Sequence, residues 1–241
     1  MDTLDSLFVA SPNRKSRSTF PGHAPRHGNP GVAVLADDAL IDRISGRLLQ
    51  LPQGLGAASG MQPDWLPDRG FDRPPVPAAV LIALVRRAAG TSILYTERSP
   101  DLRSHSGQIA FPGGKIDPTD RDAADAALRE AWEEVGLERS EARVLGYLPL
   151  YFTGTNYLIT PVVALVEPSR PFIPNPGEVR SVFEVPLERL MREDSFSTFR
   201  IRRGGKEHTT WQIDHDGLVI WGITANLTRG FHDLALTGES L

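Results

Sequence analysis

The feature that most constrains the fold is a glycine-rich turn followed directly by an acidic helix, FPGGKIDPTDRDAADAALREAWEEVGL, from Phe111 to Leu137. Pro112 has a fixed φ angle, whereas Gly113 and Gly114 can adopt backbone conformations that other residues avoid. The turn is therefore expected to bend sharply and to expose its backbone groups.

A helix is predicted directly after this turn. The residues from Ala123 to Leu128 are good helix formers, and Gly136 is a natural C-terminal stop. At the other end, Thr119 or Asp120 is placed to cap the first turn. The helix thus begins close to the glycine-rich turn.

Three glutamates, Glu130, Glu133 and Glu134, occupy positions i, i+3 and i+4 of the predicted helix and share one face. Like charges at this spacing repel, so folding alone gives no reason for the pattern. Carboxylate oxygens are the ligands that Mg²⁺ prefers, which gives the cluster a purpose. Arg129 could orient one of the carboxylates. The alternative is a solvated acidic face, which leaves the adjacent Gly-Gly turn unexplained.

This stretch resembles the Nudix box, the signature of hydrolases that cleave nucleoside diphosphates linked to another moiety. The matching residues are Gly114, Arg129-Glu130-Ala131, Glu133-Glu134 and Gly136-Leu137. The general pattern has one more glutamate, between the glycine and the Arg-Glu pair. Here that region offers only aspartates and one extra residue of spacing: Asp117, Asp120, Asp122 and Asp125. The departure affects the early acidic position and not the later glutamates.

Composition limits the classes of partner. The chain has 241 residues, a net charge of −4 and no cysteine. This charge argues against a nucleic-acid binder, and the lack of cysteine excludes disulfides and thiolate ligands. No apolar run approaches the roughly 18 residues of a membrane span, and the N-terminus lacks the apolar core of a secretory signal. We expect a cytoplasmic protein that binds a small molecule, without nucleic-acid or membrane partners, and a homodimer is an open alternative.

Composition along the chain predicts four parts. Residues 1–31, rich in Ser, Pro, Gly and Arg, are expected to form a flexible arm. Residues 32–76 are expected to contain a packing helix, from Ala39 to Leu51, and a Pro/Gly-rich linker. The hydrolase domain is placed at residues 77–236, and residues 237–241 form a tail.

The domain is predicted to be an α/β fold with a mixed β-sheet. Apolar runs suggest strands at residues 78–87, 92–98, 142–152 and 157–167, a strand leading into a short helix within 178–193, and a hairpin of 197–203 with 208–214. A closing helix is expected to begin at Ile220 and Trp221. The Nudix resemblance implies a Nudix-type α/β/α sandwich, here with an N-terminal extension.

A second motif, LYTERSPDLRSHSGQIAFPGG, lies just upstream, from Leu94 to Gly114. Arg98 and Arg103 could grip phosphate oxygens, or they could be ordinary surface arginines. His105 could contact substrate or be structural. The spacing resembles the additional motif of the coenzyme A pyrophosphatase branch of the Nudix hydrolases.

The resemblance implies hydrolysis of the pyrophosphate bond of coenzyme A, or of its acylated or oxidised forms, to 3′,5′-ADP and 4′-phosphopantetheine. It implies Mg²⁺ or Mn²⁺ as cofactor, held by Glu130, Glu133 and Glu134, with Arg129 beside them. Glu178 is a further candidate base or ligand, or an ordinary surface charge. The expected substrate-binding residues are Arg98, Arg103, Gly107, Phe111, Gly113 and Gly114.

Two alternatives remain open. The Nudix box sets the reaction and recognition loops set the substrate, so the chain could act on ADP-ribose, NADH or dinucleotide polyphosphates. It could instead be a Nudix-fold sensor that binds a nucleotide without cleaving it, although the intact Glu130, Glu133 and Glu134 argue against this.

Overall fold

The structure is a computed structural model and describes residues 30–59, 61–65, 70–100, 107–203 and 206–237. Side chains are described from residue 38 onward, except for a few within these ranges. The expectations for the arm, for Arg103 and His105, and for most of the tail therefore lie outside the described residues.

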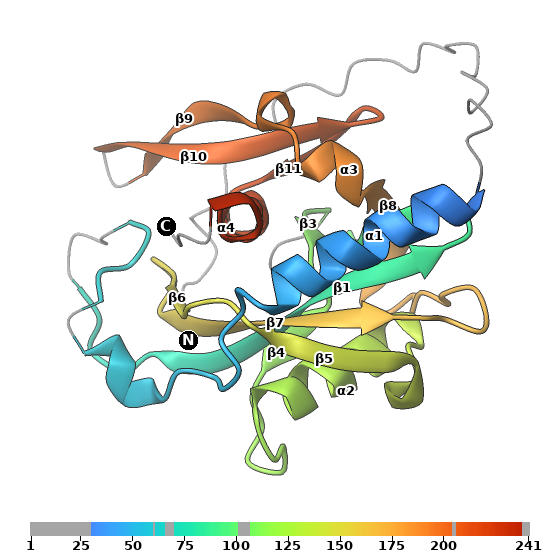
Figure 1. Ribbon diagram of the computed structural model, residues 1–241. Coiled ribbons are helices and arrows are strands. Elements are labelled where there is room, and N and C mark those ends of the chain that lie inside the picture. The colour runs from blue at the N-terminus through green and yellow to red at the C-terminus, as the bar shows by residue number, and fades with distance from the viewer. Residues whose placement is uncertain (1–29, 60, 66–69, 101–106, 204–205, 238–241) are drawn as a thin grey trace.

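Within the described residues, eight strands form one mixed sheet (Figure 1). They are β1 (Val76–Arg87), β2 (Gly90–Arg98), β3 (Ile109–Ala110), β4 (Gly113–Lys115), β5 (Ala142–Tyr147), β6 (Tyr151–Phe152), β7 (Tyr157–Val166) and β8 (Val179–Pro186). The order is β3-β2-β1-β7-β5, while β4 pairs with β1, β6 with β7 and β8 with β2. The β1–β7 pair is parallel and the other pairs are antiparallel.

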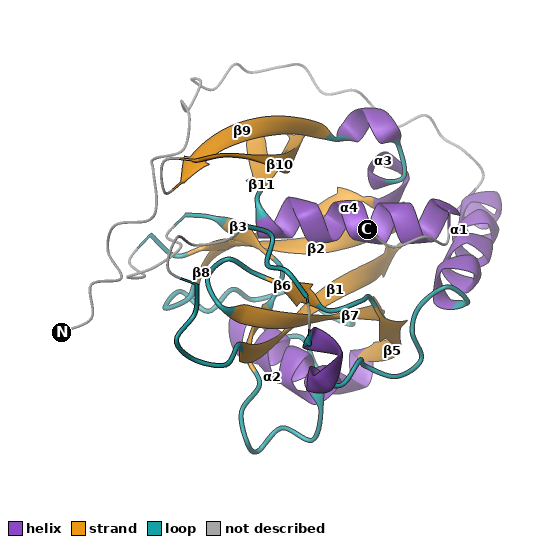
Figure 2. Ribbon diagram, turned by 90° about the vertical axis from the view of Figure 1, so that its left-hand side faces the viewer, coloured by secondary structure: helices purple, strands orange, loops and turns teal. Residues whose placement is uncertain are grey.

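Helices cover both faces of this sheet. Helix α2 (Ala123–Val135) lies on one face, whereas α1 (Pro30–Ser45) and α4 (Ile223–Thr237) lie on the other (Figures 1 and 2). This arrangement confirms the predicted α/β/α fold with a mixed sheet. The described residues also contain three 3₁₀ turns (Leu55–Ala58, Arg139–Glu141 and Glu193–Ser195) and the short helix α3 (Leu187–Leu190).

Strand β1 is the centre of two hydrophobic cores because its side chains alternate between the faces of the sheet. Leu81 belongs to the cluster that contains Ala127 of α2. Its neighbour Ile82 belongs to the opposite cluster, with Ile44 of α1 and Phe231 of α4. The long apolar run of the strand is therefore buried on both faces, as its composition predicts.

A second sheet lies beyond α4. Strands β9 (Ser197–Arg203), β10 (Lys206–His215) and β11 (Leu218–Trp221) form an antiparallel three-stranded sheet within the described residues (Figure 2). The predicted hairpin is confirmed as β9 and β10. The prediction that Ile220 and Trp221 begin the last helix is wrong. They lie in β11 because Asp216 and Gly217, both with positive φ, form a tight turn after β10.

Two other boundaries differ from the prediction. The first helix runs from Pro30 to Ser45, and Leu49 instead forms backbone hydrogen bonds with Tyr147 of the main sheet. The expected strand at residues 142–152 is split into β5 and β6, since Pro149 lies between them and has no N–H to donate. In the described part of the chain, no helix is long and apolar enough to cross a membrane.

Candidate active site

The start and end of α2 fix the orientation of the three glutamates. Asp122 is the N-cap, and its carboxylate accepts a hydrogen bond from the backbone N–H of Asp125 at 2.8 Å. The expected cap at Thr119 or Asp120 is therefore wrong by a few residues, since Asp120 has another partner. At the other end, Gly136 adopts a left-handed conformation with φ of 69°.

Glu134 is the most buried of the three glutamates, with a side-chain exposure of 2%. Its Oε1 lies 3.7 Å from Nη1 of Arg98, and the backbone N–H of Gly113 donates to its carboxylate. Its Oε2 is buried without a hydrogen-bond partner among the described residues. Burial raises the pKa of Glu134 to about 8, and the charges of Glu130 and Glu178 act in the same direction while Arg98 opposes them.

Glu130 packs against the glycine-rich turn. A Cβ atom on Gly114 would lie 2.4 Å from Glu130 Oε1, so any residue other than glycine would displace the carboxylate. Burial raises the pKa of Glu130, while the neighbouring Arg129 opposes this. Gly114 lies in β4, where it pairs with β1, and glycine is required at this position by the close approach of the Glu130 side chain.

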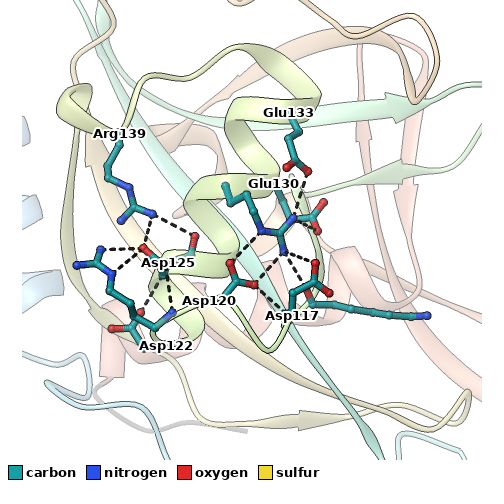
Figure 3. Close-up of polar contacts among 10 residues, drawn as sticks. Asp117, Asp120, Asp122, Asp125, Glu130, Glu133 and Arg139 are labelled. Carbon is teal, nitrogen blue, oxygen red and sulfur yellow. Dashed lines mark hydrogen bonds and ion pairs between the residues drawn. The ribbon is translucent and has the colours of Figure 1, made fainter.

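Arg129 forms a polar network with Asp120, Glu130 and Glu133, which are labelled in Figure 3. Its Nη1 donates to Glu130 Oε1 at 3.0 Å and to Glu133 Oε2 at 3.1 Å. Its Nε and Nη2 donate to the two oxygens of Asp120 at 2.9 and 3.0 Å. Arg129 therefore orients two glutamates, and the buried Asp120 orients Arg129. The ion pair with Arg129 also lowers the pKa of Asp120.

Glu178 lies next to the cluster although it is distant in sequence. Its negative charge raises the pKa of both Glu130 and Glu134. The loop that carries it is attached to the end of β2, where the backbone N–H of Ser99 donates to the Glu178 carbonyl at 2.8 Å. The structure thus brings the loop glutamate to the glutamates of α2.

A cleft with a volume of about 410 Å³ opens beside this cluster. One end is lined by Arg98, Gly113, Gly114 and Lys115. The other lining residues come mainly from both sheets, from α4 and from the 61–65 segment. Aromatic and apolar residues (Trp65, Tyr157, Ile201 and Trp221) alternate there with polar ones (Asp64, Gln108, His208, Thr209 and Asn226). The cleft therefore joins a basic end to a region of mixed apolar and polar lining that is rich in aromatic rings.

Two of the expected substrate-binding residues have mainly structural roles. Gly107 has φ of +68° and donates its N–H to the Arg98 carbonyl, which closes the loop after β2. Phe111 is buried and stacks on Tyr95 with a centroid distance of 5.0 Å, although it also borders the cleft. Arg103 lies outside the described residues.

Comparison with known proteins identifies the family. Residues 75–202 match the NUDIX domain. The chain belongs to the Nudix family. An uncharacterized Nudix hydrolase, NudL of Escherichia coli (strain K12), is 43% identical over 152 residues, which cover 63% of this chain and 79% of NudL. NudL of Escherichia fergusonii is 42% identical with the same coverage.

Solved structures of this family resemble the chain more distantly. A Nudix hydrolase of M. smegmatis, RenU, is 20% identical and aligns over 52% of this chain and 79% of RenU, with a TM-score of 0.42. A C. elegans Ap4A hydrolase is 21% identical over 47% of this chain and 81% of its own, with a TM-score of 0.39.

As a Nudix hydrolase, the protein is a metal-dependent enzyme that acts on pyrophosphate bonds of small nucleotides. The cluster suits Mg²⁺ or Mn²⁺ because Glu134 has an unpaired buried oxygen and Glu130 and Glu178 add negative charge beside it. Among the described residues, no three Asp, Glu or His side chains are already gathered as metal ligands. Here Arg129 pairs with Glu130 and Glu133.

The cleft also contains residues that the sequence reading of this Nudix chain missed. Lys115 follows the Gly-Gly pair directly, and its side chain forms no ion pair with any described residue. Its position beside the glycines was a usable signal for a phosphate contact. Trp65 is far in sequence from His208 and Trp221, which lie in the paired strands β10 and β11, and no local pattern indicates that Trp65 meets them.

Proposed function

We propose that this Nudix hydrolase cleaves the pyrophosphate bond of coenzyme A or a derivative, releasing 3′,5′-ADP and 4′-phosphopantetheine. The observation that carries the proposal is the cleft, whose basic end adjoins the glutamate cluster and whose remainder has an aromatic and mixed apolar and polar lining. Coenzyme A has a diphosphate flanked by a nucleoside and a long neutral arm, which fits such a cleft. The Leu94–Gly114 motif, which resembles that of the coenzyme A branch, gives independent support.

Glu130, Glu133 and Glu134 are the proposed metal ligands. A bound Mg²⁺ or Mn²⁺ supplies neutralisation of the diphosphate charge and a more acidic water molecule. The rest of the network positions the ligands: Asp120 holds Arg129, and Arg129 controls the direction of Glu130 and Glu133. Glu134 is positioned separately, by Arg98 and the Gly113 backbone.

Arg98 and Lys115 are the proposed diphosphate contacts. Arg98 lies between Glu134 and the cleft, and its buried Nε has no hydrogen-bond partner among the described residues. A phosphate oxygen can satisfy such a donor with a charge-assisted hydrogen bond. Lys115 adds a second positive charge at the same end of the cleft.

Glu178 is the proposed proton acceptor for the attacking water. It lies close enough to Glu130 and Glu134 to raise the pKa of both, yet it comes from a loop and not from α2. A carboxylate beside the metal ligands can receive a proton while the ligands keep their positions. The assignment of Arg103 as a phosphate contact stays a prediction from the sequence, because Arg103 lies outside the described residues.

The test is a substrate panel with product identification. Purified enzyme and Mg²⁺ are incubated with coenzyme A, dephospho-coenzyme A, NADH, ADP-ribose and a diadenosine polyphosphate, and the products are identified by mass. We expect coenzyme A to have the highest kcat/KM and to yield 3′,5′-ADP and 4′-phosphopantetheine. Rapid cleavage of another compound with coenzyme A intact would reject the substrate assignment but not the pyrophosphatase activity. The control is the same assay with the Glu134→Gln variant. Activity that persists in this variant at the wild-type level would come from contaminating hydrolases.

A further inference from the structure

A short segment outside the region matched to the Nudix family forms part of the cleft. Asp64 and Trp65 line it, although the match begins only at residue 75. Asp64 Oδ1 accepts from the backbone N–H of Gly154 at 2.6 Å, and Oδ2 accepts from the Tyr151 hydroxyl at 3.0 Å. The backbone N–H of Asp64 also donates to the Phe152 carbonyl at 2.9 Å. The segment is thus attached to β6 and to the turn that follows it.

Trp65 is held in the cleft from two sides. Its indole packs directly on Gly154, where a Cβ atom would lie 2.1 Å from Trp65 Nε1. The His208 ring of β10 meets it in an edge-on arrangement, with a centroid distance of 6.0 Å. Trp65 remains half-buried and borders the cleft. A large aromatic ring with fixed neighbours therefore forms one wall of a cleft whose charged end suits a diphosphate.

We propose that Trp65 stacks on the nucleobase of the substrate and thereby contributes to the affinity of the enzyme for nucleotides. The inference rests on the proposed function, because coenzyme A contains an adenine nucleotide. A nucleobase is flat and aromatic, and stacking requires an aromatic face in a restrained position. Ile201 and Trp221 give the same cleft apolar surface, and Asp64 adds a negative charge, so this part of the cleft suits a base better than a phosphate.

The stacking assignment is tested by calorimetric binding of ADP and of inorganic pyrophosphate, each with Mg²⁺, to wild type and Trp65→Ala. Loss of base stacking should raise the Kd for ADP about 5- to 150-fold and leave the Kd for pyrophosphate unchanged. Trp65→Phe, which keeps an aromatic ring, should restore most of the ADP affinity. Leu51→Ala is the matched control because Leu51 is 79% exposed, and it should bind both ligands like wild type.

A second variant disturbs Trp65 without removing it. Gly154→Ala places a methyl group where the indole lies, so it should reproduce the selective loss of ADP binding. Equal weakening of ADP and pyrophosphate would mean that Trp65 only supports the fold, and unchanged ADP binding would exclude stacking. Weaker binding of 4′-phosphopantetheine with normal ADP binding would assign the ring to the other arm and overturn the proposal. Neither ADP nor pyrophosphate contains the pantetheine arm. The comparison of their Kd values therefore tests the role of Trp65 even if coenzyme A is not cleaved.

Discussion

The carboxylates at the two ends of α2 have pKa values shifted in opposite directions. At the start, Asp125 accepts hydrogen bonds from Arg121 and forms an ion pair with Arg139, and these contacts hold its pKa well below its usual range. Toward the end, burial raises the pKa of Glu130 and Glu134. One helix thus carries well-compensated and poorly compensated carboxylates about two turns apart.

The helix dipole favours negative charge at the N-terminus and disfavours it at the C-terminus. Asp122 and Asp125 therefore contribute to folding, whereas Glu130, Glu133 and Glu134 stand at the unfavourable end. A cation bound at these glutamates relieves their repulsion. We infer that the acidic residues at the start of α2 stabilise the fold, whereas those near its end bind the metal. Substitutions at each end of the helix can test this division of roles.

The largest effect is expected from Glu134→Gln. The substitution keeps the size of the side chain but removes a charged ligand, so kcat should fall by at least about a hundredfold. The melting temperature without metal should be at least that of wild type, because the buried Glu134 carboxyl must either take up a proton or stay charged without a full partner. Steady-state kinetics and thermal denaturation measure the two effects.

Glu138→Gln is the matched control for this prediction. It makes the same chemical change just beyond α2, where Glu138 is half-exposed and pairs with Arg170. We expect wild-type kinetics from this variant. Near-normal activity of Glu134→Gln, or a clear loss of its metal-free stability, would contradict the division between the two ends.

Gly114→Ala should have the second largest effect. The added methyl group would lie 2.4 Å from Glu130 Oε1, so the carboxylate must move. A displacement of about 1 Å in an active site costs on the order of a hundredfold in rate, and we expect a loss of ten- to a hundredfold in kcat. Gly230→Ala is the control, since no atom lies within 4 Å of its new methyl group. Equal activity in both variants would show that Glu130 need not lie against the turn.

Much of the core was predictable from local pattern. The apolar runs of β1 and β2 and the spacing of the alanines in α2 are strong signals, because burial on a sheet or helix face dictates residue type at short range. The glutamates of α2 were identified for the same reason, since their helical spacing alone places them together. The turn at Asp216 and Gly217 is also a local signal, and the prediction of a helix at Ile220 overlooked it.

Other parts of the site depend on contacts that no local pattern encodes. Which of the four aspartates meet Arg129 is decided by the path of the loop between β4 and α2. Asp120 forms the close hydrogen bonds, and Asp117 forms a longer ion pair at 3.8 Å. Trp65 reaches the cleft because Asp64 hydrogen-bonds to Gly154, a pairing across 90 residues. The local sequence pattern of a Pro/Gly-rich linker does not indicate which part of the domain the linker contacts.

A smaller effect, and one on stability alone, is expected from Asp122→Ala. Loss of an N-cap costs about 0.5–2 kcal/mol, which lowers the melting temperature of a domain of this size by about 1–8 °C. The kcat of the folded enzyme should not change, because Asp122 only caps the helix. Asp194→Ala, which removes an exposed aspartate paired with Arg192, should be nearly neutral. Altered kcat in Asp122→Ala would mean that the start of α2 also serves the metal site.

The smallest effect, which appears in the pH dependence of stability, is expected from Asp125→Asn. The hydrogen bonds from Arg121 and the charge of Arg139 lower the pKa of Asp125 in the folded protein, so its ionised form stabilises the fold. This contribution is present above the unfolded pKa of about 4 and is lost as the pH falls through the lower folded value.

The variant should therefore be less stable than wild type at neutral pH, by less than Asp122→Ala because the pair is near the surface and partly screened. The difference in denaturant midpoint between wild type and Asp125→Asn should become smaller as the pH is lowered below about 4. High salt should also narrow it at neutral pH, because exposed ion pairs are screened. A gap that stays constant across pH and salt would mean that Asp125 acts only through its hydrogen-bond geometry. The two ends of α2 would then differ in their hydrogen bonds and not in charge compensation.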